Sequence, residues 1–124
     1  MENSTHYNGM VDALVKPADD LVDMMVEVPT LAHLNHMALG LAGETGELID
    51  AIKKHTIYGK PVDMPNILEE LGDIEFYLQG IRSAFGVTRE MCLATNQAKL
   101  EVRYASGNYS DRQAIDRADK GQGS

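Results

Sequence analysis

A stripe of mostly apolar residues between positions 30 and 55 constrains the fold of this chain more than any other feature. Its members recur at spacings of three and four and are Leu31, Leu34, Ala38, Leu41, Thr45, Leu48 and Ile52. Such spacing is typical of an amphipathic helix that buries one face. Pro29 and Thr30 supply a start signal in front of it. We therefore predict a long helix from about Thr30 to His55.

Two further helices follow the first one. The segment from Thr56 to Pro65 contains Gly59 and Pro61 and is expected to be a loop. A second stripe predicts a helix from about Asn66 to Phe85; its members are Ile67, Leu71, Ile74, Leu78 and Ile81. Thr88 is a suitable N-cap for a third helix, which extends to Tyr104 and ends before Gly107.

The two ends of the chain are less regular. Within residues 1–28 we predict one short turn of helix from Val11 to Val15, a break at Pro17, and a second short helix from Asp19 to Met25. Residues 29–107 form the predicted helical domain. Residues 108–124 are a polar tail whose last few residues are expected to be disordered.

The predicted fold class is all-α, a helical bundle, because β-branched runs are absent and the long elements are amphipathic helices. Three long helices are few for a closed core. A short N-terminal helix or a second subunit could supply the fourth, and the broad apolar faces favour a homodimer that completes the core. The stripes do not decide between a dimer and a tetramer.

Net charge and cysteine content limit the kinds of ligand and the cellular compartment that we expect for this chain. The 124 residues carry a formal net charge of −8, which disfavours binding of a nucleic-acid polymer. A triphosphate could still bind if a divalent metal reversed the local sign. Cys92 is the only cysteine, is expected to be a small core residue, and fits a reducing compartment. Neither a membrane span nor a signal peptide is evident, so we expect a cytoplasmic protein of a bacterial cell or a phage-infected host.

Two glutamates lie three residues apart in the first long helix. At about 100° per residue, Glu44 and Glu47 share one side of the helix and flank its apolar stripe. Their like charges repel each other, and nearby glycines cost on the order of 1 kcal/mol each against alanine in a helix interior. A helix that accepts both penalties usually makes room for a ligand.

The second long helix repeats this acidic pattern. Glu70 and Asp73 share one sector of it, and Tyr77 follows one turn further along. Four converging carboxylates without a cation would be strongly unfavourable, because each resists the ionisation of the others. All-oxygen ligation favours Mg²⁺, Mn²⁺ or Ca²⁺ over zinc. The alternative is that the acids are solvated surface groups, which is the usual meaning of a single pair.

Other site chemistries fit the sequence less well. A di-iron bundle requires Glu-x-x-His on two helices, and here the partners at that spacing are Glu47 and Asp73. His33 and His36 lack further nitrogen or sulfur ligands, so we interpret them as structural or surface groups. The glycines at 40–46 lie within a helix and do not match a phosphate-binding loop. A serine–histidine–acid triad has no local support either.

Several motifs in order resemble the MazG-like nucleotide pyrophosphohydrolases, and most closely the short single-domain type of phages and mobile elements. They are Gly-Leu-Ala-Gly-Glu-Thr-Gly-Glu-Leu at 40–48, Lys-Lys-His at 53–55, Tyr-Gly-Lys-Pro at 58–61, Glu-Glu-Leu-Gly-Asp at 69–73 and Asn-Gln-Ala-Lys-Leu at 96–100. The resemblance continues through Arg103-Tyr104 to Asp116-Arg117 and covers about residues 30–119.

This resemblance implies an all-α fold that binds Mg²⁺, with Mn²⁺ as a substitute, and cleaves between the α- and β-phosphates. By motif, Glu44, Glu47, Glu70 and Asp73 are the expected metal ligands and catalytic residues. Asn96, Lys99 and Tyr104 are expected to approach the nucleotide, with Lys99 on a phosphate. Lys54 and Tyr77 are weaker candidates for substrate contacts. Many members have a glutamate where this chain has Gly43, which leaves the general base open.

The resulting hypothesis is Mg²⁺-dependent hydrolysis of a nucleoside triphosphate, in particular a deoxynucleotide, to monophosphate and pyrophosphate, for house-cleaning or nucleotide-pool control. Glu47 is our candidate for orienting or deprotonating the attacking water. Two alternatives come from other classes: a catalytically silent module that binds a nucleotide or a protein, and a plain helical dimerisation protein with solvated acids.

Overall fold

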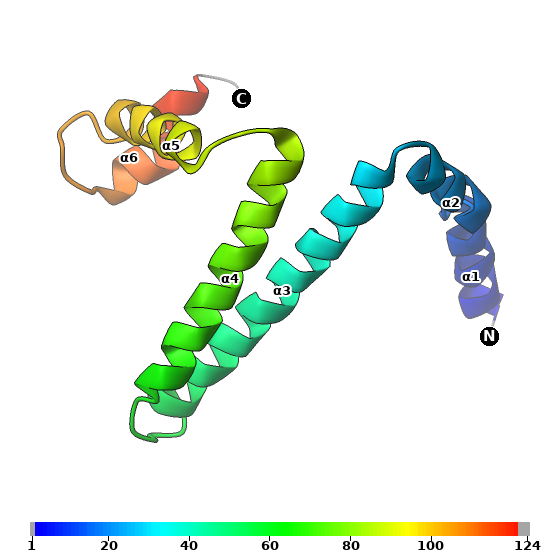
Figure 1. Ribbon diagram of the computed structural model, residues 1–124, viewed down its shortest axis with the longest axis horizontal. Coiled ribbons are helices and arrows are strands. Elements are labelled where there is room, and N and C mark those ends of the chain that lie inside the picture. Colours follow the sequence, from blue (N-terminus) through cyan, green and yellow to red (C-terminus); the bar gives the residue numbers. More distant parts are fainter. Residues whose placement is uncertain (1, 122–124) are drawn as a thin grey trace. The chain divides into compact units, whose positions relative to one another are not determined.

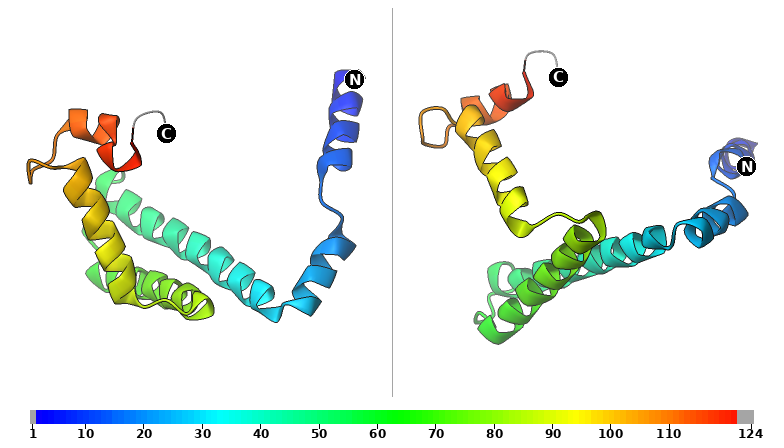
Figure 2. Two further views of the ribbon diagram at one scale, coloured as in Figure 1. Left: turned by 90° about the horizontal axis from the view of Figure 1, so that it is seen from above. Right: turned by 45° about the horizontal axis from the view of Figure 1, so that its top comes forward.

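Two long antiparallel helices dominate the first part of the chain. The computed structural model describes residues 2–121, and it divides into two units, Met1–Tyr77 and Leu78–Ser124. Helix α3 (Pro29–Thr56) and helix α4 (Met64–Phe85) are joined by a short loop (Figure 1). Figure 2 shows from two further directions that α3 and the beginning of α4 lie side by side. Both helices end within two residues of their predicted limits.

Proline and basic residues define the ends of α3. Pro29 occupies the first turn, where its missing N–H removes no helical hydrogen bond. Lys53, Lys54 and His55 lie in the last turn, where positive charge interacts favourably with the helix dipole. After the helix, Gly59 has a φ of 68°, a conformation that favours glycine and turns the chain toward α4.

The N-terminal segment contains more helix than its sequence pattern predicts. Helix α1 spans Glu2–Leu14 and helix α2 spans Ala18–Glu27, with Pro17 between them. The prediction of α2 is confirmed, including Asp19 and Asp20 in its first turn. The prediction of a single turn from Val11 to Val15 is wrong. The described side chains of α1 are exposed, so the helix has no buried stripe for periodicity to detect.

Little of the first unit is buried within one chain. Met37 and Ala51 on α3 are the buried apolar residues, and Glu70 on α4 is a buried acid, among the residues that the structure describes. Many large apolar side chains of α3 and α4 are more than half exposed, namely Leu39, Ile49, Leu68 and Phe76. A single copy of these helices therefore leaves much of its apolar surface in contact with water.

The second unit contains helix α5 (Arg89–Arg103), helix α6 (Asp111–Asp116) and the 3₁₀ helix η1 (Ala118–Lys120). Thr88 caps α5 as predicted, because its hydroxyl accepts a hydrogen bond from the Met91 N–H at 3.1 Å. Ser110 caps α6 in the same way. The segment after residue 107, which was predicted as a polar tail, thus forms two short helices. The predicted disorder of the last few residues falls on 122–124, outside the described residues.

An ion pair attaches this C-terminal segment to α5. The Arg103 Nε donates to Asp119 Oδ1 at 2.7 Å and Nη2 donates to Oδ2 at 3.3 Å. Only 16% of the arginine side chain and 6% of the aspartate side chain are exposed. Cys92, in contrast, is exposed. The expectation of a core cysteine is wrong because the face of α5 that carries it has no covering element within the second unit.

Within residues 2–121, none of the helices is both long enough and apolar enough to span a membrane. This agrees with the absence of such a segment in the sequence pattern.

Candidate metal centre

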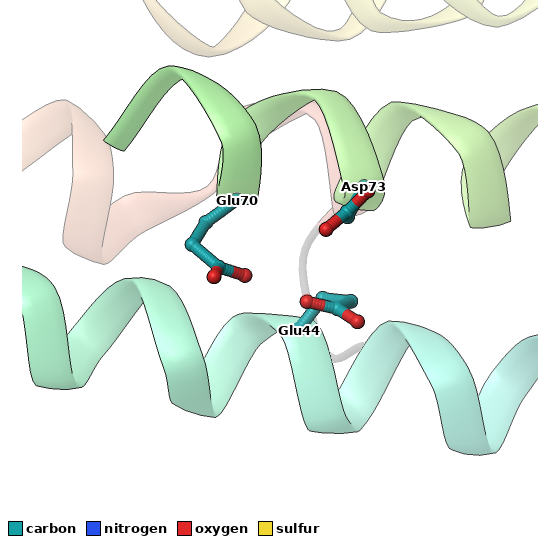
Figure 3. A group of neighbouring side chains, drawn as sticks. All are labelled: Glu44, Glu70 and Asp73. Carbon is teal, nitrogen blue, oxygen red and sulfur yellow. The ribbon is translucent and has the colours of Figure 1, made fainter. Parts of the chain in front are cut away.

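Three carboxylates from two helices point toward one another in the first unit. Glu44 projects from α3, and Glu70 and Asp73 project from α4 (Figure 3). The two α4 acids lie three residues apart, so both project from the side of α4 that faces α3. One ligand oxygen of each carboxylate lies within 4.8 Å of the others. Spacing in the sequence could place each pair of acids only on one side of its own helix. The hairpin of α3 and α4 brings acids from both helices together.

Glu70 is the most enclosed member of this group. Its exposed fraction is 9%, and its Oε2 atom is buried without a hydrogen-bond partner in the described part of the chain. Glu44 and Asp73 are partly exposed. A buried carboxylate oxygen without a donor is unfavourable in water-free surroundings unless it is protonated or binds a cation.

The electrostatic environment of Glu70 resists its ionisation. A hydrogen bond with Glu44, followed by loss of solvation and by the negative charges of Glu44, Glu47 and Asp73, raises the pKa of Glu70 to about 7. Like charges held this close disfavour the fully ionised state. A divalent cation would remove this repulsion, because it offers positive charge to all of the carboxylates at once.

The donor set fits a hard cation. Carboxylate oxygens are the ligands that Mg²⁺, Mn²⁺ and Ca²⁺ prefer, and the group contains neither thiolate nor imidazole. The buried Oε2 atom of Glu70 has no hydrogen-bond partner in the described part of the chain and supplies one unsatisfied acceptor to the group. Because their ligand atoms are all carboxylate oxygens and one of these oxygens is unpaired, Glu44, Glu70 and Asp73 suit a divalent metal ion.

Glu47, the fourth predicted acid, lies outside this close group. It is exposed, one turn beyond Glu44 on α3. Its charge nevertheless contributes to the raised pKa of Glu70. The role of Glu47 as a ligand or as a residue that orients water therefore remains a prediction.

Tyr77 and Lys54 lie on opposite sides of the carboxylates along the hairpin. Tyr77 follows Asp73 by four residues on α4, and its ring rests on the backbone of α3 at Gly40. Lys54 lies in the last turn of α3, where its Nζ is 3.1 Å from Asp50 Oδ2. The predicted contacts of these two residues with substrate remain untested.

The remaining predicted substrate residues belong to the second unit. Asn96 and Lys99 line a shallow pocket of about 420 Å³ along α5, together with Met91 and Cys92. Tyr104 lines a neighbouring pocket of about 650 Å³, and its ring centroid lies 5.6 Å from that of Tyr109.

His33 and His36 are not part of a metal group among the described residues. The ring of His36 makes an edge contact with Tyr77, with a centroid separation of 6.5 Å and an interplanar angle of 73°. Both histidines are exposed on α3, and their interpretation as structural or surface groups stays a prediction.

Sequence reasoning missed the role of Gly40. It counted the glycines at 40, 43 and 46 as equivalent signs of space for a ligand. The structure separates them, because only Gly40 of these three has a side chain packed against it. The available signal was Gly40 one turn before Glu44 and Tyr77 one turn after Asp73, on two helices joined by a short loop.

A comparison with known protein families identifies the family to which this chain belongs. The family model described as MazG nucleotide pyrophosphohydrolase domain matches residues 32–105. This range includes α4, α5, the carboxylate group and nearly all of α3. No curated protein and no solved structure matches the chain. Because the match covers more than half of the sequence, the chain belongs to the MazG nucleotide pyrophosphohydrolase family.

Proposed function

We propose that this protein hydrolyses nucleoside triphosphates, deoxynucleotides in particular, to the monophosphate and pyrophosphate with Mg²⁺ as cofactor. The observation that carries the proposal is the convergence of Glu44, Glu70 and Asp73, whose ligand oxygens lie within 4.8 Å of one another. Family membership supports a nucleotide substrate. Glu70 has a raised pKa of about 7 and a buried oxygen without a hydrogen-bond partner among the described residues, which supports a site that a bound cation completes.

Glu44, Glu70 and Asp73 would hold Mg²⁺, or Mn²⁺ as a substitute, with Glu47 as the fourth predicted ligand. When bound, the cation would supply the positive charge that compensates the phosphates and the leaving pyrophosphate. Glu70 must lose its proton before its carboxylate can act as a full ligand, because its pKa lies near 7.

The other residues of the chain position the reactants. Water adds to the α-phosphorus, the bond to the bridging oxygen breaks, and pyrophosphate leaves with that oxygen. Glu47 orients the water or accepts its proton, because it is an exposed carboxylate one turn from Glu44. Lys99 contacts a phosphate, and Asn96 and Tyr104 approach the nucleotide. Lys54 is a further candidate for a phosphate contact, and Tyr77 is a candidate for a contact with the sugar. Positioning and charge carry most of the rate in such a reaction.

The proposed active species is a homodimer, in which a second copy covers the apolar side chains that one chain leaves exposed, among them Leu39 and Phe76. Pairing of two such dimers would give a tetramer. We place the catalytic domain at residues 29–107 and the protein in the cytoplasm of a bacterium or of a phage-infected host. Removal of damaged nucleotides and adjustment of the deoxynucleotide pool both require this reaction.

The test is pyrophosphate release from the common ribo- and deoxyribonucleoside triphosphates, with Mg²⁺ and with EDTA. Monophosphate and pyrophosphate in equal amounts, formed with Mg²⁺ and absent in EDTA, would support the proposal and rank the bases. Release of inorganic phosphate in place of pyrophosphate would contradict the assigned bond cleavage. Nucleotide binding without turnover would favour a catalytically silent binding module.

A further inference from the structure

The ring of Tyr77 occupies the space that any side chain at position 40 would need. An ideal Cβ atom built on Gly40 would lie 2.6 Å from the Tyr77 Cδ1 atom and closer still to Cε1 and Cζ. The same construction at Gly43 and Gly46, on the same helix, meets nothing within 4 Å. Of these three glycines, only Gly40 is therefore required by a packing contact within the chain.

Two neighbouring rings flank Tyr77 and restrict its orientation. The His36 ring, one turn before Gly40 on α3, contacts it at a centroid distance of 6.5 Å. The Phe76 ring is nearly perpendicular to it at 5.2 Å. Both arrangements are edge-to-face, which is a favoured geometry for aromatic pairs. The Tyr77 ring thus has a defined seat formed by the Gly40 backbone and two aromatic edges.

This seat lies next to the carboxylates on both helices. Gly40 precedes Glu44 by four residues on α3, and Tyr77 follows Asp73 by four residues on α4. Four residues correspond to about 6 Å of rise along a helix and to roughly the same face. The aromatic seat is therefore one helical turn from the candidate metal site.

Toward its C-terminal end, α3 carries basic residues in place of aromatic rings. Its last turn carries Lys53, Lys54 and His55, which suit the negative charge of phosphates. Aromatic rings suit the flat, partly apolar nucleoside. Within the first unit, this polarity suits a nucleotide whose nucleoside lies toward Tyr77 and whose phosphates lie toward the carboxylates, with Lys53 and the Asp50-paired Lys54 beyond them.

We infer that Gly40 is a positioning residue whose missing side chain seats the Tyr77 ring against α3. The inference rests on the proposed function, in which Tyr77 contacts the nucleotide, and deepens it by naming the residue that fixes the position of that ring. Gly40 itself does not touch substrate or metal. It acts through Tyr77, so its replacement weakens substrate binding and leaves the chemical step intact.

The first test compares Gly40→Ala with Gly46→Ala, which adds the same methyl group to the same helix in open space. For the four common deoxynucleoside triphosphates with Mg²⁺, we expect Gly40→Ala to raise KM about 10-fold with kcat within about twofold of wild type, a loss of about 1.4 kcal/mol in binding. Gly46→Ala keeps both constants. An unchanged KM in Gly40→Ala, or a fall in kcat alone, overturns the inference.

A double-mutant cycle tests whether Gly40 acts through Tyr77. In a Tyr77→Ala background the methyl group of Gly40→Ala meets no ring, so the second substitution should change KM no further. An undiminished effect of Gly40→Ala in that background overturns the inference. If Gly40→Ala alone does not fold, circular dichroism decides: restored helix and restored Tm in the double variant support the seat, and no restoration contradicts it.

Binding of deoxynucleoside monophosphates in EDTA, measured by calorimetry, separates failure of this inference from failure of the proposed function. Monophosphate binding that Gly40→Ala weakens, in a protein without turnover, contradicts the proposed function alone. Turnover with a wild-type KM in Gly40→Ala contradicts the inference alone. A wild-type protein that neither binds monophosphate nor hydrolyses triphosphate contradicts both.

Discussion

The carboxyl groups of Glu44 and Glu70 lie on different helices with ligand oxygens within 4.8 Å of each other, and a proton held between them raises the pKa of Glu70 to about 7. The sequence distance between these residues is large, but the α3–α4 hairpin brings them together (Figure 3). Without metal, a proton on Glu70 relieves the repulsion among the acids. With metal, the cation takes over that role, so the pair links the pH response of the protein to its metal response.

The metal-free protein should lose stability as pH rises from about 4.5 to 7. Glu70 has a folded-state pKa of about 7 against an ordinary pKa of 4.5, so the folded state holds the proton more tightly than the unfolded state. The resulting stabilisation is complete below the unfolded pKa and is lost as pH rises through the folded pKa. The measurement is Tm in EDTA across this range for wild type and Glu70→Gln.

The difference between those two proteins isolates Glu70 from the other titrating groups. We expect the Tm of wild type to fall relative to that of Glu70→Gln as pH rises through 7. Parallel Tm curves for the two proteins would show that the assigned pKa is wrong. Addition of Mg²⁺ should raise the Tm of wild type more at pH 8 than at pH 6, because metal and proton compete for the same carboxylate.

Much of the fold was accessible from local patterns. The limits of α3 and α4 followed from the apolar stripes of period 3.6, from Pro29, and from the glycine and proline residues of the loop between them. Thr88 as the N-cap of α5 was also predicted and is confirmed. These features depend on neighbours within a few residues, which a sequence displays directly.

Features that depend on distant contacts were not accessible in the same way. Helix α1 is exposed and shows no stripe, and Arg117 turns the chain into η1 with a φ of 48° that no pattern indicated. The spacing of the acids predicted two pairs, whereas the structure gathers three acids and leaves Glu47 outside. The contact of Gly40 with Tyr77 depends on the packing of α3 against α4, which a sequence does not specify residue by residue.

The C-terminal segment should detach from α5 when the Arg103–Asp119 pair is broken. A hydrogen bond from Arg103 lowers the pKa of Asp119 below its usual value, so this contribution is present above the unfolded pKa and is lost as pH falls through the folded one. We expect Asp119→Asn to increase amide hydrogen exchange in α6 and η1 at pH 7. Asp116→Asn is the matched control, since its exposed pair with Arg112 contributes little.

Equal exchange in Asp119→Asn and Asp116→Asn would contradict this role for the Arg103–Asp119 pair. Exchange in α3 should not change in either variant, because the affected helices pack on α5.

A homodimer should form through the apolar faces of the long helices. Leu39 is 66% exposed in one chain, and burial of a leucine side chain is worth roughly 1.5–3 kcal/mol. We expect Leu39→Asp to shift the protein toward monomer in sedimentation equilibrium, whereas His33→Asp, at an exposed polar position about 120° away around the same helix, leaves the assembly intact. A wild-type protein that sediments as a monomer at all concentrations would contradict the proposed dimer.

Glu70→Gln compared with Glu69→Gln tests the central claim most directly. The two substitutions remove one negative charge from adjacent positions of α4, but Glu70 is buried among the carboxylates and Glu69 is exposed. We predict that Mg²⁺-dependent pyrophosphate release from deoxynucleoside triphosphates falls on the order of 100-fold or more in Glu70→Gln, the scale of loss of one electrostatic group in an active site. Glu69→Gln should stay near the wild-type rate. Wild-type release by Glu70→Gln would contradict the assignment of this carboxylate group as the catalytic metal centre.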